Sequence, residues 1–509
     1  MKRRALLHSL AATPVALSTV LWSDAARAAI GPTLTIAYNF APPGFDPNSG
    51  SYATSPGLQS IFKTIYDPFY EQGEDLSLQP GVMDQFSWSS DRNKISMRLR
   101  PGVVWQDDKP VTIDDILWNV RRMSDPASGN PLATVFASAK NFSVIGNILT
   151  FDVTPWRANM LERLSFLACY LIPPHYYQQV GKEGFEKRPM GSGPYMFDKF
   201  ERGSFLRLKA NPRYWGKKPA FETVVFKFIT DPAARVAEIE RGTSDLTVDV
   251  PYEEYERLRT KPGLIGTAAP ITDIAMIFLN SVGVMQDANV RKAAAHAIDK
   301  KLIVSSIHRN LATPIDTLLA PQYKGYDASI KVAYDPALAE SLLKASGYSR
   351  DKPVEFTIQT TRGYKPKDYE TVQAIVEMWR RVGIKANVEV YEIAKHFELR
   401  SQHKLAPAAF YNWGNSTADP ESSLGTAMVT NSPHSSWKSA DLDARIRPLF
   451  EERDQDKRIA GYKAVNAYIA ENAYVLPLFQ FFQPVLHKRE IKFTPHLAGH
   501  ILPSKITRA

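Results

Sequence analysis

Cysteine is almost absent from this chain. Cys169 is the only cysteine among 509 residues. A single thiol cannot form an intrachain disulfide, a Cys-x-x-Cys redox pair or a thiolate zinc cluster. The fold must therefore be stabilised by its apolar core, which a chain of this length can bury without cross-links.

Strong charge of one sign and long apolar runs are also missing. The formal net charge is +9, and it falls to +6 without residues 1–28, which hold four basic and one acidic side chain. This charge is too small and too scattered for a nucleic-acid-binding stripe, so we expect no nucleic-acid partner. No run of about 18 apolar residues follows residue 28, so we expect no membrane span.

Sequence motifs of several enzyme classes are missing as well. The chain has no GxxxxGK[ST], HExxH or GxSxG motif. The sequence therefore does not support a P-loop protein, a zinc protease or a hydrolase with a nucleophile elbow. Two glycines ahead of Pro194, at residues 191 and 193, favour a tight turn over a phosphate loop. We expect no catalysis and no cofactor.

Two histidines near the C-terminus have the spacing of a helical metal-binding pair. They are His496 and His500. Pro495 and Gly499 oppose a helix there, and no carboxylate is close in sequence. We therefore predict no metal site at this position.

The first 28 residues have the pattern of an export signal. Three basic residues start the chain, a mildly apolar stretch covers residues 5–21, and small residues occupy the two positions that a signal peptidase reads. We predict cleavage after Ala28, by general secretion or, given Arg3 and Arg4, by the twin-arginine route; a frayed N-terminal helix is the alternative. No cysteine lies at the cleavage point, so we expect a soluble, exported, periplasmic protein without a lipid anchor.

The first half of the remaining chain is rich in strand patterns. Residues 33–39 and 94–100 alternate apolar with smaller or polar side chains, which predicts two strands. A turn at residues 101–102 followed by the apolar residues 103–105 predicts a hairpin. Thr112 ahead of two acidic residues predicts the start of a helix with one apolar face.

The later half alternates strands and helices. Residues 354–358 and 384–390 alternate as strands, and apolar residues at helical spacing lie between them, which predicts a βαβ unit. Asp335 and Pro336 predict the start of an earlier helix. Another helix is predicted over 459–469, and the apolar run 475–482 predicts a buried strand that returns to the N-terminal domain.

Residues 411–420 combine large rings with small polar side chains. Such a mixture suits a surface loop that approaches a ligand with its backbone while a ring covers it. The alternative is that Trp413 merely packs in the core. The predicted ligand-binding residues are Trp413, Tyr411, Asn412, Asn415, Ser416 and Asp419.

Several short blocks occur in the order of a known family. The chain resembles the extracellular solute-binding proteins of ABC importers, family 5, which handle oligopeptides, dipeptides and nickel. Each block is weak alone, but the ordered set spans nearly the whole chain after residue 28. The blocks are IYDPFY at 65–70, RLRPGVVW at 98–105, KPVTIDD at 109–115, GSGPY at 191–195, NPRYW at 211–215 and VRKA with AIDK between 290 and 300.

That resemblance implies an α/β, two-lobed, three-domain periplasmic binding protein of the Venus-flytrap type, type II, large cluster C. Its lobes would close over a ligand, so that binding shifts an open–closed equilibrium. The implied domain I comprises residues 29–69, 186–279 and 476–509, domain II comprises 70–185, and domain III comprises 280–475.

The resemblance also implies partners. We expect a monomer that binds a small organic solute and delivers it to the permease subunits of an ABC importer in the inner membrane. A peptide or peptide-like compound is the solute that we expect first. Non-peptide cargoes remain open, namely opine-like compounds, sugars or metal chelates. A secreted hydrolase is a distant alternative, because no nucleophile, base and oxyanion donors can be assembled from the sequence.

One position departs from that family's pattern. Peptide-binding members carry an aspartate three residues after the loop tryptophan, and its carboxylate pairs with the α-ammonium of the peptide. Ser416 occupies this position here. A hydroxyl cannot neutralise a buried ammonium, which is costly to bury without a counter-charge. Either Asp419, three residues further on, supplies the carboxylate, or the ligand has no free amine.

Overall fold

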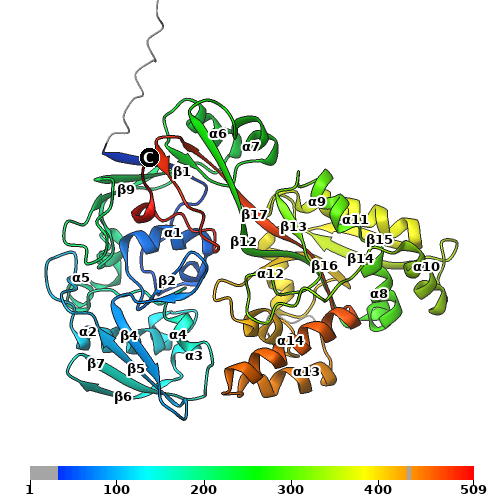
Figure 1. Ribbon diagram of the computed structural model, residues 1–509, viewed down its shortest axis with the longest axis horizontal. Helices are drawn as coiled ribbons and strands as arrows, with labels where there is room; N and C mark the ends of the chain where they lie inside the picture. The colour runs from blue at the N-terminus through cyan, green and yellow to red at the C-terminus, as the bar shows by residue number, and fades with distance from the viewer. Residues whose placement is uncertain (1–31, 433–436) are drawn as a thin grey trace, which may run out of the picture.

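The chain forms two lobes that stand side by side (Figure 1). The structure is a computed structural model that describes residues 32–432 and 437–509. The predicted export signal, residues 1–28, lies outside the described residues. The antiparallel strands β12 (Leu264–Leu279) and β17 (Val475–Lys488) run from one lobe into the other. We define the first lobe as residues 32–263 and 489–509 and the second lobe as residues 280–474.

An eleven-stranded mixed sheet continues through both lobes, in the order β15-β14-β16-β12-β17-β11-β1-β10-β9-β8, with β13 also paired to β17. β1 is parallel to β10 and β11, and β14 is parallel to β15 and β16. The first lobe contributes β1 (Thr33–Tyr38), β8 (Tyr195–Glu201), β9 (Phe205–Ala210), β10 (Thr223–Phe228) and β11 (Leu246–Thr247). The second contributes β13 (Ala312–Pro314), β14 (Val354–Thr360), β15 (Ile384–Val390) and β16 (Ala408–Gly414).

The pairing of β12 with β17 is interrupted where the chain passes between the lobes. The register shifts after Pro270. The backbone groups released there find other partners: Gln480 Nε2 donates to the Ile271 carbonyl at 2.8 Å, and Tyr323 Oη donates to the Thr272 carbonyl at 2.8 Å. Because such an irregularity bends a strand locally, this segment is the candidate pivot between the lobes.

A separate antiparallel sheet in the first lobe has the order β4-β5-β7-β6. The strand predicted at 94–100 is confirmed as β5, but the predicted hairpin with residues 103–105 is wrong. β5 pairs instead with β4 and β7, which occupy both of its edges, and residues 103–105 bond to residues 109–111. The bounds are β4 (Met83–Trp88), β5 (Lys94–Leu99), β6 (Ala139–Ile145) and β7 (Ile148–Val153).

Two short strand pairs complete the first lobe. They are β2 (Glu71–Gln72) with β3 (Leu78–Gln79), and β18 (Ile491–Lys492) with β19 (Thr507–Arg508). The turn between β2 and β3 carries Leu76, which is buried in the apolar core of the second lobe. The β2–β3 hairpin is therefore a point of contact between the lobes.

The helices of the first lobe begin where the sequence supplies caps. The predicted start at Thr112 is confirmed, because the Asp115 N–H donates to the threonine hydroxyl and the Thr112 N–H donates to the aspartate carboxylate. The helices are α1 (Pro56–Ile65), α2 (Ile113–Ser124), α3 (Ala133–Phe136), α4 (Met160–Arg163), α5 (Pro174–Lys187), α6 (Pro232–Glu240) and α7 (Tyr252–Leu258).

The second lobe confirms the predicted βαβ unit, since α11 connects the parallel strands β14 and β15. The predicted helix after Asp335 is α10, whose Leu338 N–H donates to the aspartate side chain at 2.8 Å. The helix predicted at 459–469 lies within α14. The bounds are α8 (Ala288–His296), α9 (Lys300–Ser306), α10 (Pro336–Ala345), α11 (Asp368–Val382), α12 (Ile393–Ser401), α13 (Ala440–Ile446) and α14 (Gln455–Asn472).

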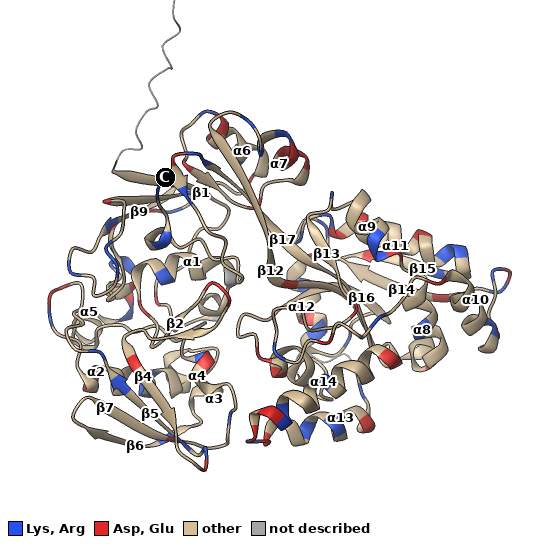
Figure 2. Cartoon of the chain, viewed as in Figure 1, with Lys and Arg blue, Asp and Glu red and all other residues tan. Residues whose placement is uncertain are grey.

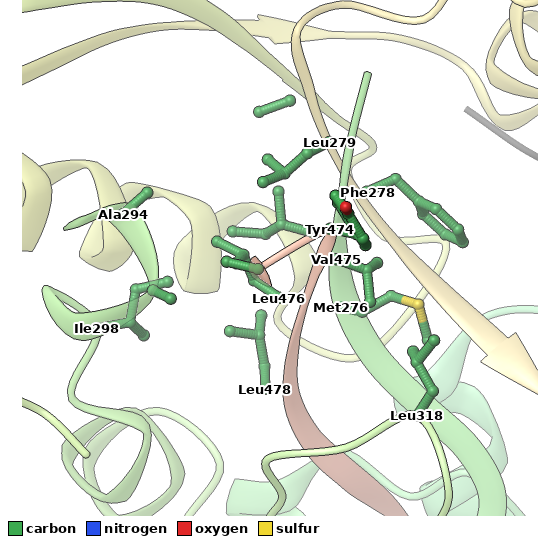
Figure 3. Packing of buried hydrophobic residues seen from close by; sticks show 14 of the residues in the cluster. Met276, Phe278, Leu279, Ala294, Ile298, Leu318, Tyr474, Val475, Leu476 and Leu478 are labelled. Carbon is green, nitrogen blue, oxygen red and sulfur yellow. The ribbon is translucent and has the colours of Figure 1, made fainter. Parts of the chain in front are cut away.

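The second lobe encloses one apolar core to which the long strands contribute, whereas the first lobe contains two separate cores, one around β1 and β10 and one around β5 and β7. Leu476 and Leu478 lie on one side of β17, toward Ala294 and Ile298 (Figure 3). The buried strand predicted at 475–482 is confirmed, and β17 then continues to pair with β11 of the first lobe. The connection between the lobes is thus anchored by side-chain packing at both of its ends.

The predicted glycine turn near residue 193 is present, and both glycines are required by close packing. A Cβ atom on Gly191 would lie 2.5 Å from the carbonyl oxygen of Ile65, and one on Gly193 would lie 2.6 Å from the same oxygen. Such distances are far below van der Waals contact, so the turn fastens β8 against the end of α1.

Candidate functional site

The first three predicted ligand-binding residues lie on a strand. Tyr411, Asn412 and Trp413 belong to β16, which pairs with β12 through Gly414. The prediction of a loop over the whole of 411–420 is therefore wrong for residues 411–414, because the long strand β12 offers an edge to which they bond. The loop begins at Asn415.

Tyr411 is the centre of an aromatic stack at the second lobe. Its ring is stacked on Tyr364, with centroids 6.2 Å apart and planes 2° apart, and on His396, with centroids 4.6 Å apart. The guanidinium of Arg400 lies 5.1 Å from the Tyr411 ring centroid. Burial lowers the pKa of His396 to about 4, so this imidazole is neutral near pH 7. Tyr364 and Phe397 keep 39% and 36% of their surfaces exposed, and the stack therefore presents aromatic surface outward.

Trp413 has two environments. Its ring is half-buried and packs against the core of the second lobe, edge-on to Phe278 with centroids 6.5 Å apart. Its neighbour Asn412 is buried, and the side-chain oxygen of Asn412 accepts no hydrogen bond from any described residue. A half-buried ring that packs against the core is compatible with both core packing and ligand contact.

Asn415 uses its side chain to hold the loop together. Its Nδ2 donates to the Asp419 carbonyl at 2.8 Å and to Ser423 Oγ at 3.1 Å, while its Oδ1 accepts from Thr417 Oγ1 at 3.0 Å. The residue is buried. These bonds fix the shape of residues 415–419. The shape of this loop in turn sets how far Ser416 is exposed.

The carboxylate of Asp419 is bound by Arg458 of α14. The arginine Nη1 and Nη2 donate to the two carboxylate oxygens at 2.8 and 2.7 Å, and Nη2 also donates to Glu421 at 2.9 Å. All three residues are buried. Burial and the charge of Asp419 raise the pKa of Glu421. Burial lowers the pKa of Arg458, but the hydrogen bonding to Asp419 and the negative charges of Asp419 and Glu421 outweigh it and raise that pKa. Asp419 therefore acts as an internal counter-charge.

Ser416 is joined to the first lobe through its backbone. Gln72 Nε2, on β2, donates to the Ser416 carbonyl at 2.6 Å. Further out, Arg453 Nη1 of the second lobe donates to the Asp91 carbonyl of the first at 2.9 Å. The candidate loop is thus part of the interface between the lobes. Sequence analysis missed Gln72, because no local pattern marks a residue whose partner lies 344 positions away.

A second residue that sequence analysis missed is Glu162 of α4. The carbonyl of Leu164, just after this helix, accepts hydrogen bonds from the N–H groups of Phe69 and Tyr70, and this places α4 beside β2. Burial and the negative charge of Asp419 raise the pKa of Glu162. The charge of the candidate loop therefore acts on α4 of the opposite lobe. A single glutamate in a mostly apolar segment gives no sequence signal for such a position.

The two C-terminal histidines lie outside any helix, as predicted, with their rings stacked and their centroids 4.8 Å apart. Burial lowers the pKa of His496 to about 3 and, with the nearby His496, lowers that of His500 well below its usual value. His496 Nδ1 accepts a hydrogen bond from the Ala498 N–H at 3.1 Å. Among residues 32–432 and 437–509, no group of three or more His, Cys, Asp or Glu could hold a metal ion.

The surface charges are mixed over both lobes (Figure 2). Basic and acidic side chains are interspersed on both lobes, and many form ion pairs such as Arg257 with Glu240. In the described part of the chain, no helix combines the length and apolarity needed to cross a membrane.

The two-lobed fold, with its long connecting strands and a polar interface between the lobes, defines a binding protein of the type II class. Residues 77–433 match the family model of the bacterial extracellular solute-binding proteins, family 5. The chain belongs to this family, and the family resemblance found in the sequence is confirmed.

Known relatives extend the match to nearly the whole chain. The dipeptide-binding protein of Escherichia coli (strain K12) is 23% identical, over 90% of this chain and 91% of that protein. The di/tripeptide-binding protein 2 of Pseudomonas aeruginosa (strain UCBPP-PA14) is 27% identical, over 91% and 92%. The crystal structure of a dipeptide binding protein from Pseudoalteromonas sp. SM9913 in complex with Met-Leu superimposes with a TM-score of 0.78, at 18% identity, over 94% of this chain and 100% of that one. These matches confirm the predicted fold class.

Proposed function

We propose that this chain is the substrate-binding protein of an ABC importer and that it captures a peptide or peptide-like solute between its lobes for delivery to the permease subunits. Membership of family 5 and the peptide-binding relatives support the class of protein. The observation that carries the proposal is the bond from Gln72 to Ser416, because it brings the candidate loop of the second lobe against a strand of the first. A ligand held there would contact both lobes.

The proposal assigns the predicted residues two different tasks. Side chains at the interface between the lobes would contact the ligand, whereas those that bond to other residues of the second lobe would shape the loop. The proposed ligand contacts are Tyr411, Asn412, Trp413 and Ser416, and the proposed loop-forming residues are Asn415 and Asp419. The domain boundaries given above, a periplasmic location after removal of residues 1–28, a monomeric state and the absence of catalysis belong to the same proposal.

Calorimetric titration with di- to pentapeptides tests the proposed function. We expect tight binding of at least one length class, and recovery of the peptide with unchanged mass after incubation. Binding of an opine, a sugar or a nickel chelate in place of every peptide would overturn the peptide assignment. Cleavage of the bound peptide would favour a hydrolase.

A further inference from the structure

A half-buried arginine of the second lobe has no carboxylate to pair with. Arg400, on α12, forms no ion pair and no side-chain hydrogen bond within residues 32–432 and 437–509. Its guanidinium lies instead 5.1 Å from the ring centroids of both Phe397 and Tyr411. Ring faces attract a cation, but they neither neutralise its charge nor occupy its five N–H donors. Arg400 therefore keeps its capacity to bind an anion.

The acidic side chains on the elements around this arginine are occupied elsewhere or distant. On α12 itself, Glu398 accepts a hydrogen bond from Lys395 at 3.0 Å. Glu392, at the N-terminal end of the helix, precedes Arg400 by eight residues, which is about 12 Å along the helix axis. The other acidic side chains and their donors are Asp273 with Lys365, Asp368 with the N–H groups of Gly363 and Tyr364, and Glu389 with Tyr391.

A buried imidazole adds a second donor without an acceptor. His396 is stacked on Tyr411 and precedes Arg400 by one helical turn. Gln359 Oε1 accepts from the Ala406 N–H at 2.9 Å, so its Nε2 is the group that donates to His396 Nδ1, at 3.2 Å. The neutral imidazole therefore carries its hydrogen on Nε2, which has no acceptor among the described residues. The unused hydrogen-bonding capacity of this cluster is thus on the donor side.

The same cluster exposes aromatic surface beside the cation. Tyr364 and Phe397 meet edge-on with centroids 6.3 Å apart, and each keeps more than a third of its surface exposed. Exposed apolar surface that is contiguous and bordered by polar groups is typical of binding sites. The cluster therefore offers a place for a flat apolar group next to a place for an anion.

The fold places this cluster at the edge of the sheet that meets the first lobe. β14, β15 and β16 are parallel, and Tyr364 follows β14 as α12 follows β15. At the same edge β16 continues into residues 415–419, where Gln72 of the first lobe contacts Ser416. In Figure 1, α12 lies on the side of the second lobe that is turned toward the first lobe. Ligands of open α/β sheets bind outside the carboxyl ends of the strands, which is where this cluster lies.

The chemistry of the cluster selects its ligand group. A guanidinium forms two parallel hydrogen bonds with a carboxylate, and it repels an ammonium. Exposed rings favour contact with another ring. Ser416 supplies no counter-charge for an ammonium in the neighbouring loop. The complementary ligand group is therefore a carboxylate that carries an aromatic substituent.

We propose that Arg400 binds the α-carboxylate of a peptide whose C-terminal residue is aromatic, and that Tyr364 and Phe397 form the surface on which that side chain packs. This inference rests on the proposed peptide-binding function. The cluster then selects the ligand at its C-terminal end, by charge and by side chain together. A free aromatic carboxylic acid presents the same chemistry and serves as a separate probe.

Calorimetry with four probes tests the site, namely Ala-Phe, the C-terminal amide of Ala-Phe, Ala-Ala and 3-phenylpropanoate. We expect the wild type to bind Ala-Phe at least about tenfold more tightly than the amide, and at least about tenfold more tightly than Ala-Ala. Arg400→Gln should lose the preference for the acid over the amide, and Arg400→Lys, which keeps the charge without the paired N–H groups, should retain part of it. Lys395→Gln removes a cation of the same helix that Glu398 already compensates, and this control should keep the full preference.

A second pair of variants tests the aromatic surface. Phe397→Ala should lose the preference for Ala-Phe over Ala-Ala and keep the preference for the acid over the amide. Tyr334→Ala removes a ring of the second lobe that is 48% exposed and lies ahead of α10, and this control should keep both preferences. An equal loss of both preferences in Phe397→Ala would contradict the separate roles of the ring and the arginine.

Each failure has a separate meaning. A wild type that binds Ala-Phe and its amide equally, or an Arg400→Gln variant with an unchanged preference, would overturn the carboxylate site and leave the peptide-binding function standing. Binding of 3-phenylpropanoate without either dipeptide would support the site and overturn the peptide assignment. Failure of every acid to bind would overturn the site, and the panel of di- to pentapeptides then decides the proposed function separately. Thermal unfolding shows whether each variant is folded, and the comparison of acid and amide on the wild type decides the inference even where a variant does not fold.

Discussion

Gln72 of β2 donates a hydrogen bond to the Ser416 carbonyl at 2.6 Å, across the interface between the two lobes. The donor lies in a hairpin whose Leu76 is buried in the core of the second lobe. The acceptor lies in a loop fixed by Asn415. The bond therefore reports the relative position of two rigid bodies, and its loss should change their equilibrium.

Gln72→Ala should shift the ligand-free protein toward the open arrangement. Removal of the inter-lobe bond leaves the Ser416 carbonyl to water, which is accessible only when the lobes separate. We expect a larger radius of gyration in small-angle X-ray scattering and weaker peptide binding. Gln79→Ala, an exposed residue of the same hairpin, is the control and should match the wild type in both measurements.

Arg458→Met should destabilise the second lobe strongly. The change leaves Asp419 and Glu421 buried without a counter-charge, which typically costs about 3–5 kcal/mol of the free energy of unfolding. Urea unfolding measures this loss. Lys457→Met, at a position whose side chain is 74% exposed, should stay within about 0.5 kcal/mol of the wild type. A similar, small effect of both substitutions would show that the buried ion triad is dispensable.

Trp413→Ala should weaken peptide binding by about 1–3 kcal/mol while the protein still folds. The ring is only half-buried against the core, so its removal should cost ligand contact more than stability. Calorimetry and thermal unfolding together separate the two effects. Trp88→Ala, a half-buried tryptophan of β4, should leave the affinity unchanged. Unfolding of Trp413→Ala would instead assign this ring to the core.

How much of this structure the sequence could predict depends on the range of the interactions. The βαβ unit formed by β14, α11 and β15 was predicted because the hydrophobic period changes from two to about 3.6 and back within the segment. The hairpin at residues 103–105 was predicted wrongly, because the edge of β5 is taken by β7, about fifty residues further along the chain. Local patterns therefore predicted the helices and strands. Which strands pair was decided by competition between strands that are distant in the sequence.

The candidate site, too, could be predicted only as far as its residues interact locally or match the family pattern. Trp413 and Ser416 were found from composition and family pattern. The pairing of Asp419 with Arg458, which removes it as a free ligand group, joins residues 39 positions apart and leaves no mark on the sequence near either one. Gln72 lies on the other lobe and becomes a candidate only when the fold places it against the loop.

Asp67 should make the stability of the protein depend on pH. Burial, together with the charge of Glu71, raises the pKa of its carboxyl from 3.8 to about 7, against the hydrogen bond donated by Trp215 Nε1 at 2.9 Å. Between these pKa values the folded state binds more protons than the unfolded state, so the free energy of unfolding falls as the pH rises. Below both pKa values this loss of stability is absent, because the carboxyl is protonated in the folded and the unfolded state.

Asp67→Asn removes that titration. We expect the free energy of unfolding of the variant, relative to the wild type, to rise by a few kcal/mol between about pH 4 and about pH 8. Urea unfolding at several pH values measures the difference, in which the contributions of all other titrating groups cancel. A difference that is flat with pH, or that falls, would show that the folded Asp67 ionises normally.

Capture of a peptide by closure of the two lobes is the central claim. Small-angle X-ray scattering of the wild type, with and without the tightest-binding peptide of the calorimetric panel, tests it most directly, with the melting temperature measured on the same samples. We expect saturating peptide to reduce the radius of gyration and to raise the melting temperature by mass action. A peptide that binds tightly and raises the melting temperature but leaves the scattering profile unchanged would contradict closure as the mode of binding.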